Sequence, residues 1–224
     1  MTRMAAFDLE IARPVVDNNW TGNGISCAVC VLSDDPNVLV WQGQPELGTL
    51  GVDSIVASLD AIYSDGYQIA TFNGAGFDFK VLADECSAQL GIAKWLARNH
   101  FDMFFNLFCH LGYGPGLDRL ARGMGFSGKT EGVDGAMAPD MWQAGRYQEV
   151  IEYCIQDTRL TLQLAQAVTE RGAAEWTSKS GKLQSVKIDR WLTVTEAVQL
   201  PEPDNSWMGD RAWSRSKFVG WCGL

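Results

Sequence analysis

The segment that most constrains the fold lies near the start of the chain, where two acids interrupt an apolar run. Residues 4–11 read MAAFDLEI. In an extended strand, side chains two residues apart share a face, so Asp8 and Glu10 point the same way while their apolar neighbours point the other way. Two like charges on a buried strand are costly unless cations neutralise them. The alternative is a surface strand with a solvated acidic face, and the D-x-E pair alone does not decide between the two.

The order of apolar segments predicts an α/β domain with a mixed five-stranded sheet flanked by helices. Short β-rich runs predict strands at 4–11, 25–32, 38–41, 68–72 and 100–103. Helical spacing of apolar residues predicts helices at 53–63, 77–90, 93–98, 104–111, 117–124 and 146–171. Strands that begin as a meander and then alternate with helices favour this architecture. The glycine-rich segment 125–139 predicts a loop.

The bulk composition favours a cytoplasmic protein. The chain has 224 residues and is 46% hydrophobic, which is enough for one large domain, or for a domain with an appendage, around a full core. Its apolar stretches are shorter than a membrane span needs, and a strand follows too soon after the start to leave room for a signal peptide. The six cysteines are scattered and lie mostly in apolar runs, so we expect reduced thiols.

The net charge of −9 argues at first against a nucleic-acid partner. The charge is uneven, however: residues 1–170 carry 10 Lys/Arg against 21 Asp/Glu, and residues 171–224 carry 8 against 6. An acidic body that holds divalent cations can still bind phosphates, because the ions reverse the local sign of the charge. The charge therefore leaves nucleic acid open as a partner.

The composition changes after Gly172. The segment 173–224 contains five of the nine tryptophans and is mildly basic. We therefore predict a domain at 1–172 and a small C-terminal extension at 173–224. Aromatic and basic side chains together could bind a single nucleic-acid strand. The alternative, which we prefer, is that the tryptophans pack on the core or on a partner chain.

Two further motifs carry acids. In residues 71–82 (TFNGAGFDFKVL), a strand turns into a helix whose first turn holds Asp78. Ligand sites in such sheets lie at the carboxyl ends of strands, although an acid there could simply complement the helix dipole. On the long helix, Tyr153 and Asp157 are four residues apart and share a face. A phenol and a carboxylate so placed could address one water, although an exposed Tyr/Asp pair explains the spacing equally.

In combination the three motifs are more specific. The acid pair on the first strand, the N-x-x-x-F-D turn and the Y-x-x-x-D helix resemble the motif set of the DEDD exonucleases, in the subclass marked by tyrosine. That superfamily has the RNase H-like fold and includes the proofreading domains of DNA polymerases. The resemblance covers residues 4–170. The segments 138–142, 145–150 and 153–158 (APDMW, GRYQEV and YCIQDT) are similar to stand-alone bacterial and phage relatives of the family B polymerase exonuclease domain.

The resemblance implies a metal-dependent 3′–5′ exonuclease, bacterial or phage-encoded, that acts on single-stranded DNA. It implies that Asp8, Glu10, Asp78 and Asp157 bind two Mg²⁺ or Mn²⁺ ions, with Asp8 bridging both. Glu10 and Asp157 would complete the ion site that activates water, and Asp78 would serve the other ion. Tyr153 would orient the attacking water as a neutral phenol. Hard oxygen ligands suit these cations, and two ions suit phosphodiester hydrolysis.

Several assignments stay open. Leu9, Asn73 and Lys129 are candidate substrate-binding residues, but Asn73 could merely stabilise its turn and Lys129 could be a solvated loop lysine. Asp102 could approach the site, although we prefer that it caps the helix that follows. An RNA exonuclease of the same fold is the second functional hypothesis. A nucleic-acid-binding module of that fold without catalysis is the third, and the five intact motif residues argue against it.

Overall fold

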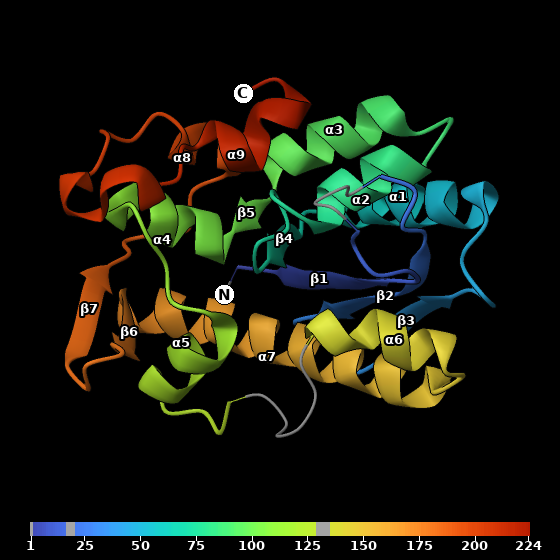
Figure 1. Ribbon diagram of the computed structural model, residues 1–224, viewed down its shortest axis with the longest axis horizontal. Helices are drawn as coiled ribbons and strands as arrows, with labels where there is room; N and C mark the ends of the chain where they lie inside the picture. Colours follow the sequence, from blue (N-terminus) through green and yellow to red (C-terminus); the bar gives the residue numbers. More distant parts are fainter. Residues whose placement is uncertain (1, 17–20, 129–134) are drawn as a thin grey trace.

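A mixed five-stranded sheet forms the centre of the computed structural model (Figure 1). The structure describes residues 2–16, 21–128 and 135–224, so Lys129 lies outside the described residues. The sheet has the order β3-β2-β1-β4-β5, and its strands are β1 (Met4–Ile11), β2 (Ile25–Leu32), β3 (Val38–Gln42), β4 (Gln68–Thr71) and β5 (Phe101–Asp102). The main helices are α1 (Thr49–Ser64), α2 (Asp78–Glu85), α3 (Leu90–Asn99), α4 (Met103–Leu111), α5 (Leu117–Gly123), α6 (Ala138–Gln143) and α7 (Tyr147–Arg171).

The central strand β1 pairs differently with its two neighbours. It runs antiparallel to β2 along nearly its whole length, from Ala5 to Ile11. It runs parallel to β4 over Met4–Ala6, and beyond Ala6 the chain of β4 turns away into α2. On the β4 side, the carboxyl half of β1, which carries both acids of the first motif, therefore lies beside the start of α2 instead of a strand.

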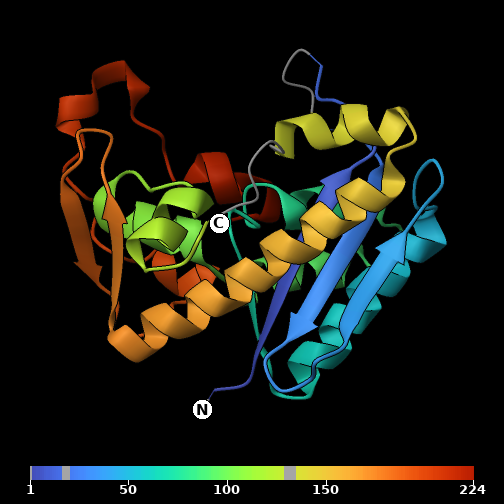
Figure 2. The same cartoon turned by 90° about the horizontal axis from the view of Figure 1, so that it is seen from below.

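Helices cover both faces of the sheet, with α1, α2 and α3 on one side and α5, α6 and α7 on the other (Figures 1 and 2). The side chains of Phe7, Leu9 and Ile11 join the core cluster on the α1 side. Met4 and Ala6 join the cluster on the α7 side. Because side chains alternate along a strand, the acids of β1 face α7, as the sequence predicts.

The predicted helix at 77–90 is wrong in its extent, because the chain breaks at Cys86 and a new helix begins at Leu90. The carboxylate of Asp53, on α1, accepts hydrogen bonds from the backbone N–H groups of Ser87, Ala88 and Gln89, with donor–acceptor distances of 3.0 to 3.3 Å. A neighbouring helix thus supplies acceptors for amides that a continuous helix would bond internally. Segment-local patterns do not reveal such a partner.

The predicted loop at 125–139 also ends early. Residues 135–137 form a 3₁₀ turn, and α6 starts directly after it at Ala138. Pro139 lies in the first turn of α6, where proline is tolerated because its missing N–H would have no partner within the helix. The segment is short and contains a proline, so it shows no helical periodicity from which α6 could be predicted.

The segment after Gly172 folds against the body of the protein. It forms a hairpin, β6 (Ala173–Thr177) with β7 (Leu183–Lys187), followed by α8 (Val194–Ala197), η2 (Ser206–Arg211), α9 (Ser216–Val219) and η3 (Gly220–Cys222). The rings of Trp176 and Trp191 are buried, and Trp191 stacks on Phe101 with 5.7 Å between ring centroids. The preferred alternative, that the tryptophans pack on the core, is confirmed for Trp176 and Trp191. The division at residue 172 stays a prediction.

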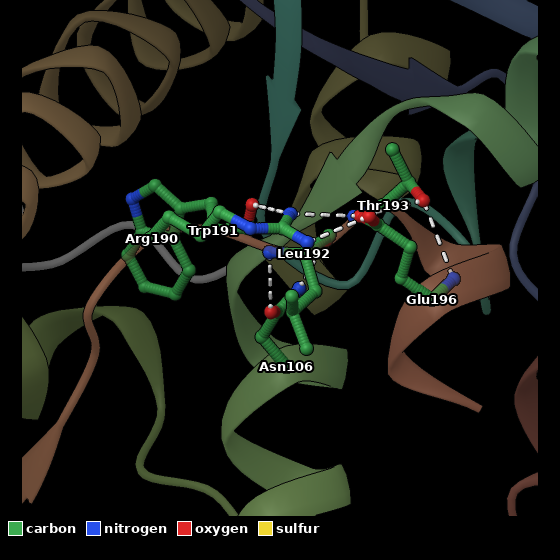
Figure 3. Close-up of polar contacts among 6 residues, drawn as sticks. All are labelled: Asn106, Arg190, Trp191, Leu192, Thr193 and Glu196. Carbon is green, nitrogen blue, oxygen red and sulfur yellow. Dashed lines mark hydrogen bonds and ion pairs between the residues drawn. The ribbon is translucent and has the colours of Figure 1, made fainter. Parts of the chain in front are cut away.

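A network of polar contacts fixes the middle of this segment to α4 (Figure 3). The amide group of Asn106 donates to the carbonyl of Leu192 at 2.9 Å and accepts from its N–H at 3.0 Å. The guanidinium of Arg190 makes two bonds to Glu196, which also completes a capping box with Thr193 at the start of α8. A buried side-chain amide whose donor and acceptor are both used fixes the path of the backbone.

All six cysteines are free thiols, and each is buried except for the half-buried Cys86. None of the helices in the described ranges combines the length and the apolar character that crossing a membrane requires. The thiol prediction is confirmed.

We predict that His100 makes the fold sensitive to acid. The ring is buried, with its nitrogens 3.1 Å from the carbonyl of Leu96 and 3.0 Å from the hydroxyl of Thr71, and burial lowers its pKa to about 4. The unfolded chain takes up this proton near pH 6.5 and the folded chain only near pH 4, so stability is lost as the pH falls between these values. The loss from pH 7 to pH 5 should be about 2 kcal/mol.

The measurement is urea unfolding of wild type and His100→Gln at pH 7 and pH 5. The raised pKa values of Asp78 and Asp102 make the folded state more stable as the pH falls, which opposes the effect of His100. Both acids are present in both proteins, so the difference between the two losses in free energy of unfolding reports on His100. We expect the wild type to lose more free energy of unfolding than the variant over this range. Equal losses in both proteins would show that His100 does not control acid stability.

Candidate active site

The first strand presents its two acids to the helix α7. Asp8 is half-buried and Glu10 is buried, and both lie on the α7 face of β1. The thiol of Cys154, on α7, lies 3.7 Å from the carbonyl oxygen of Asp8 and 3.9 Å from its carboxylate. The long helix therefore packs directly against the acidic part of the strand, so the solvated-surface alternative for the first motif is wrong.

Asp78 reaches the same strand from the start of α2. Its Oδ1 accepts a hydrogen bond from the backbone N–H of Leu9 at 3.0 Å, and the residue is only 2% exposed. Burial raises the pKa of Asp78 to about 7, against the lowering effects of the Leu9 amide and of a hydrogen bond with Asp8. Two carboxyl groups so close share a proton when no cation is present. At neutral pH this pair therefore carries less than its full negative charge.

The turn that leads to Asp78 is held by Asp102. The buried carboxylate of Asp102 accepts from the N–H groups of Asn73 at 2.8 Å and Ala75 at 3.0 Å, and also from Phe105 at 3.1 Å. The bond to Phe105 confirms that Asp102 caps α4. Burial raises its pKa to about 6, while the backbone N–H groups oppose that rise. One carboxylate thus joins the cap of one helix to the turn before another.

Asn73 adopts the left-handed conformation that this turn requires, with φ of 72°. Asparagine tolerates that region better than most residues. Its carbonyl accepts from the N–H groups of Gly76 and Phe77, which closes the turn. Gly74 is needed for a close approach, because a Cβ there would lie 2.4 Å from the hydroxyl of Thr71. The turn-stabilising role of Asn73 is confirmed, and substrate binding by its side chain stays a prediction.

The third motif lies on the face of α7 toward the sheet. Tyr153 and Asp157 are both buried there. Burial raises the pKa of the Tyr153 phenol far above its usual value, and the carboxylates of Asp157 and Glu10 raise it further. The phenol is therefore neutral and keeps its proton near pH 7. The main chain of Gly135 passes close above it, since a Cβ there would lie 3.4 Å from the phenol oxygen.

These residues surround one cavity of about 680 Å³. Asp8, Glu10, Tyr153, Asp157 and Asn73 line it, so residues from the first strand, the turn and the long helix meet at one place. Asp78 lies behind the backbone of Leu9 instead of on the wall. The side chain of Leu9 is 1% exposed in the core cluster, and only its position on β1 brings it to the cavity. A role for Leu9 in substrate binding stays a prediction.

The remaining wall is mostly apolar and was not anticipated from the sequence. Its side chains include Phe72, Phe77, Phe104, Pro139, Thr161 and Trp213. Phe72 and Phe77 flank the turn of the second motif, so the sequence motif indicates that they lie near the site. Phe104 and Thr161 follow from helix faces only once the helices are placed. No local signal distinguishes Trp213 from the other tryptophans after Gly172.

The donor set fits hard divalent cations in its chemistry. Every candidate ligand offers carboxylate oxygen, the donor that Mg²⁺ and Mn²⁺ prefer. Within residues 2–16, 21–128 and 135–224, no three Asp, Glu, His or Cys side chains are already arranged to hold an ion. Asp78 shows one reason, since its carboxyl group is hydrogen-bonded to the amide of Leu9 and to Asp8. Ion binding would displace the shared proton and bring these carboxylates onto the cation.

The sequence matches one protein family over most of this core. A sequence profile of the RNase_H superfamily matches residues 51–169, which is more than half of the chain. The protein therefore belongs to the RNase H superfamily, and the predicted RNase H-like fold is confirmed. The matched range contains Asp78, Tyr153 and Asp157, and it begins after β1. A search of curated proteins finds no significant match.

A solved structure has the same fold. The family B DNA polymerase from the hyperthermophilic archaeon Pyrobaculum calidifontis superposes with a TM-score of 0.54 at 18% sequence identity. The superposition covers 75% of this chain and 24% of the polymerase, so this chain spans about a quarter of the polymerase's length. At that identity the likeness concerns the fold alone, which is an RNase H-like nuclease fold.

We predict that Asp102→Asn destabilises the protein by about 1–3 kcal/mol, the usual cost of an unsatisfied buried amide. Asparagine keeps one acceptor oxygen but turns an NH₂ group toward a backbone N–H, either that of Ala75 or those of Asn73 and Phe105. Denaturant unfolding at pH 8, where Asp102 is ionised, measures the loss. Asp60→Asn, at a half-buried position on α1, is the control and should change stability little. Equal stability of the two variants would contradict a structural role for Asp102.

Proposed function

We propose that this protein is a metal-dependent 3′–5′ exonuclease that hydrolyses single-stranded DNA by a two-metal-ion mechanism. The observation that carries the proposal is the convergence of three distant segments on one cavity. Acids from β1 and α7 line it together with a phenol, and the acid at the start of α2 hydrogen-bonds to β1 beside it. Four carboxylates and a neutral phenol supply what phosphodiester hydrolysis needs from a protein, namely cation ligands and a group that positions water.

The four carboxylates have distinct positions. Asp8 hydrogen-bonds with Asp78 and lines the same cavity as Glu10 and Asp157, so it has a contact or a shared wall with each of the other three. Asp8 would therefore be the ligand shared by two Mg²⁺ or Mn²⁺ ions, with Glu10 and Asp157 completing one site and Asp78 serving the other. The bound ions would supply Lewis-acid polarisation of the phosphate and stabilise charge on the attacking and leaving oxygens.

Tyr153 would position the attacking water. Because burial and neighbouring carboxylates keep the phenol protonated, it does not act as a base. Its hydroxyl hydrogen-bonds with the carboxylate of Asp157, and the phenol oxygen can still accept a hydrogen bond from the attacking water. Holding a nucleophile in line lowers the barrier through orientation, without any proton transfer by the tyrosine.

Apolar and aromatic side chains on the other wall favour a strand with unpaired bases. Phe72, Phe77 and Phe104 present ring surface to the same cavity as the acids. Aromatic rings bind unpaired bases by stacking, with little dependence on sequence. An RNA strand would offer the same phosphates and bases, so RNA is the alternative substrate.

We predict that Asp8→Asn and Asp157→Asn lower the turnover of single-stranded DNA by about a thousandfold or more, because each removes a cation ligand worth several kcal/mol in the transition state. Glu152→Gln is the matched control, since Glu152 neighbours Tyr153 on α7 but points to solvent. It should retain wild-type turnover. The assay follows 5′-labelled and 3′-labelled strands of DNA and of RNA in Mg²⁺ and in Mn²⁺.

A 3′–5′ exonuclease shortens the 5′-labelled strand stepwise and releases the 3′ label at once as a mononucleotide. The reverse pattern would contradict the direction, and faster cleavage of RNA would make RNA the substrate. Wild-type protein that binds strands and cleaves none with either ion would indicate a non-catalytic binding module. Activity that survives Asp8→Asn would exclude the mechanism.

We predict that Mg²⁺ or Mn²⁺ raises the melting temperature, and raises it more at pH 8 than at pH 6. The pKa of Asp78 is raised to about 7, so at pH 6 a cation must first displace its proton, whereas at pH 8 the carboxylate is already ionised. A hundredfold excess of ion over its Kd would add about 2.7 kcal/mol.

The measurement is thermal unfolding with and without ion at each pH. Asp78→Asn carries no titrating group at this position, so the shift caused by the ion should be smaller in this variant and should differ less between the two pH values. Glu152→Gln should behave as wild type. A melting temperature that millimolar ion leaves unchanged at both pH values would contradict a cation site among these carboxylates.

A further inference from the structure

Trp213 lines the cavity of the candidate active site, although it lies far outside the matched range 51–169. It faces the same space as Asp8, Tyr153 and Asp157. The residue is 48% exposed, which leaves part of its ring area accessible for contact. The C-terminal segment thus adds an aromatic surface to a site that the RNase H core builds.

The five tryptophans after Gly172 differ in their surroundings. Trp176 and Trp191 are buried, and Trp221 donates from its indole nitrogen to the carbonyl of Ala75 at 2.8 Å. Their packing explains them. Trp207 is 64% exposed but lies against Tyr113, with 5.9 Å between ring centroids, and it is not among the described residues of the cavity wall. Trp213 therefore combines exposure with a place at the site.

The ring of Trp213 packs against a buried side chain of the core. Phe218 lies behind it at 5.8 Å between centroids, and Phe218 is itself buried in the core against Phe104 and Phe108. Arg215 follows Trp213 by two residues, and its guanidinium donates to four backbone carbonyls, including that of Cys109 near the end of α4. A rigid aromatic ring loses little entropy on binding, so it is an efficient contact surface.

An exposed cation lies over this ring. The ammonium of Lys217 is 3.8 Å from the ring centroid of Trp213, and its side chain is exposed. A cation–π contact at an exposed site is worth about 0.5–1 kcal/mol. Stacking of one nucleobase on an aromatic side chain is worth about 1–3 kcal/mol. A base can therefore displace the ammonium, which is then free to contact a phosphate of the same strand.

We propose that Trp213 is a base-stacking platform for the unpaired strand, and that Lys217 moves from its ring to the strand's backbone. This inference rests on the proposed exonuclease function and names the substrate feature that the site recognises, a base face upstream of the scissile bond. Stacking accepts any base, so the platform confers no sequence preference. It does distinguish a strand with a base at the stacked position from one without.

The test uses single-stranded DNA with one abasic site, placed in turn at each of the positions next to the 3′-terminal nucleotide. Wild-type protein should show a KM raised about tenfold when the abasic site falls at the stacked position, and an unchanged kcat. Trp213→Ala should show that higher KM on intact strands and no further rise with the abasic site. Trp213→Phe should keep most of the wild-type difference in KM between the intact strand and the strand with the abasic site. Trp207→Ala is the matched control and should behave as wild type.

A small phosphodiester with no base or aromatic ring upstream of the scissile bond, thymidine 5′-monophosphate methyl ester, separates this inference from the function. Wild type and Trp213→Ala should cleave it equally, which also shows that the variant is folded. Wild-type protein inactive on both the strands and the ester would overturn the proposed function. If wild type is active but its KM responds to abasic sites in the same way as the KM of Trp213→Ala, the stacking platform is overturned and the proposed function is not.

Lys217→Gln tests the second half of the inference. If the ammonium contacts a phosphate, removing it should reduce the salt dependence of strand binding by about one contact, measured as the slope of log Kd against log salt. The same substitution frees the ring of Trp213, so the response to the abasic site should persist. An unchanged slope would overturn the movement of Lys217 to the backbone.

Discussion

The hydrogen bond from the Leu9 amide to Asp78 holds the two halves of the site together. In a sheet, each strand's N–H groups need acceptors on both sides, and β4 supplies them to β1 only as far as Ala6. Beyond that point a carboxylate from the next helix takes over, with an N–O distance of 3.0 Å. The early departure of β4 thus creates both the space for a site and the need for an acid beside it.

That arrangement places negative charge where it is costly. Asp78 and Asp102 are both fully buried, and burial raises the pKa of each. They differ in what offsets the cost: Asp102 accepts from the N–H groups of several residues, including Asn73, Ala75 and Phe105, whereas Asp78 accepts from the Leu9 N–H and faces another carboxyl group. The first is therefore a structural acid whose hydrogen bonds compensate its burial. The second is a group whose charge is compensated only in part, which is the state that a cation would relieve.

The sequence predicts those features that depend on the periodicity of a single strand or helix. It does not predict features that depend on hydrogen bonds to residues distant in the sequence. The alternation along β1 is a property of one strand, so the common face of Asp8 and Glu10 follows from the order of the residues alone. The shared face of Tyr153 and Asp157 follows in the same way from one helix. The break at Cys86 depends instead on Asp53 from another helix, and α6 lacks the length to show a pattern. Local propensity gives way in such places to tertiary hydrogen bonds.

The C-terminal segment shows the same limit most clearly, and it changes how the site should be understood. Composition marked it as rich in tryptophan, but only the folded chain separates Trp191, which stacks in the core, from Trp213, which faces the cavity. The segment also supports the turn of the second motif, because Trp221 donates to Ala75 and a Cβ on Gly76 would lie 3.0 Å from Phe218. Removing the segment would therefore disturb the turn that leads to Asp78 as well as the aromatic wall. Only single substitutions on its exposed surface can separate its contribution to binding from its contribution to the architecture of the site.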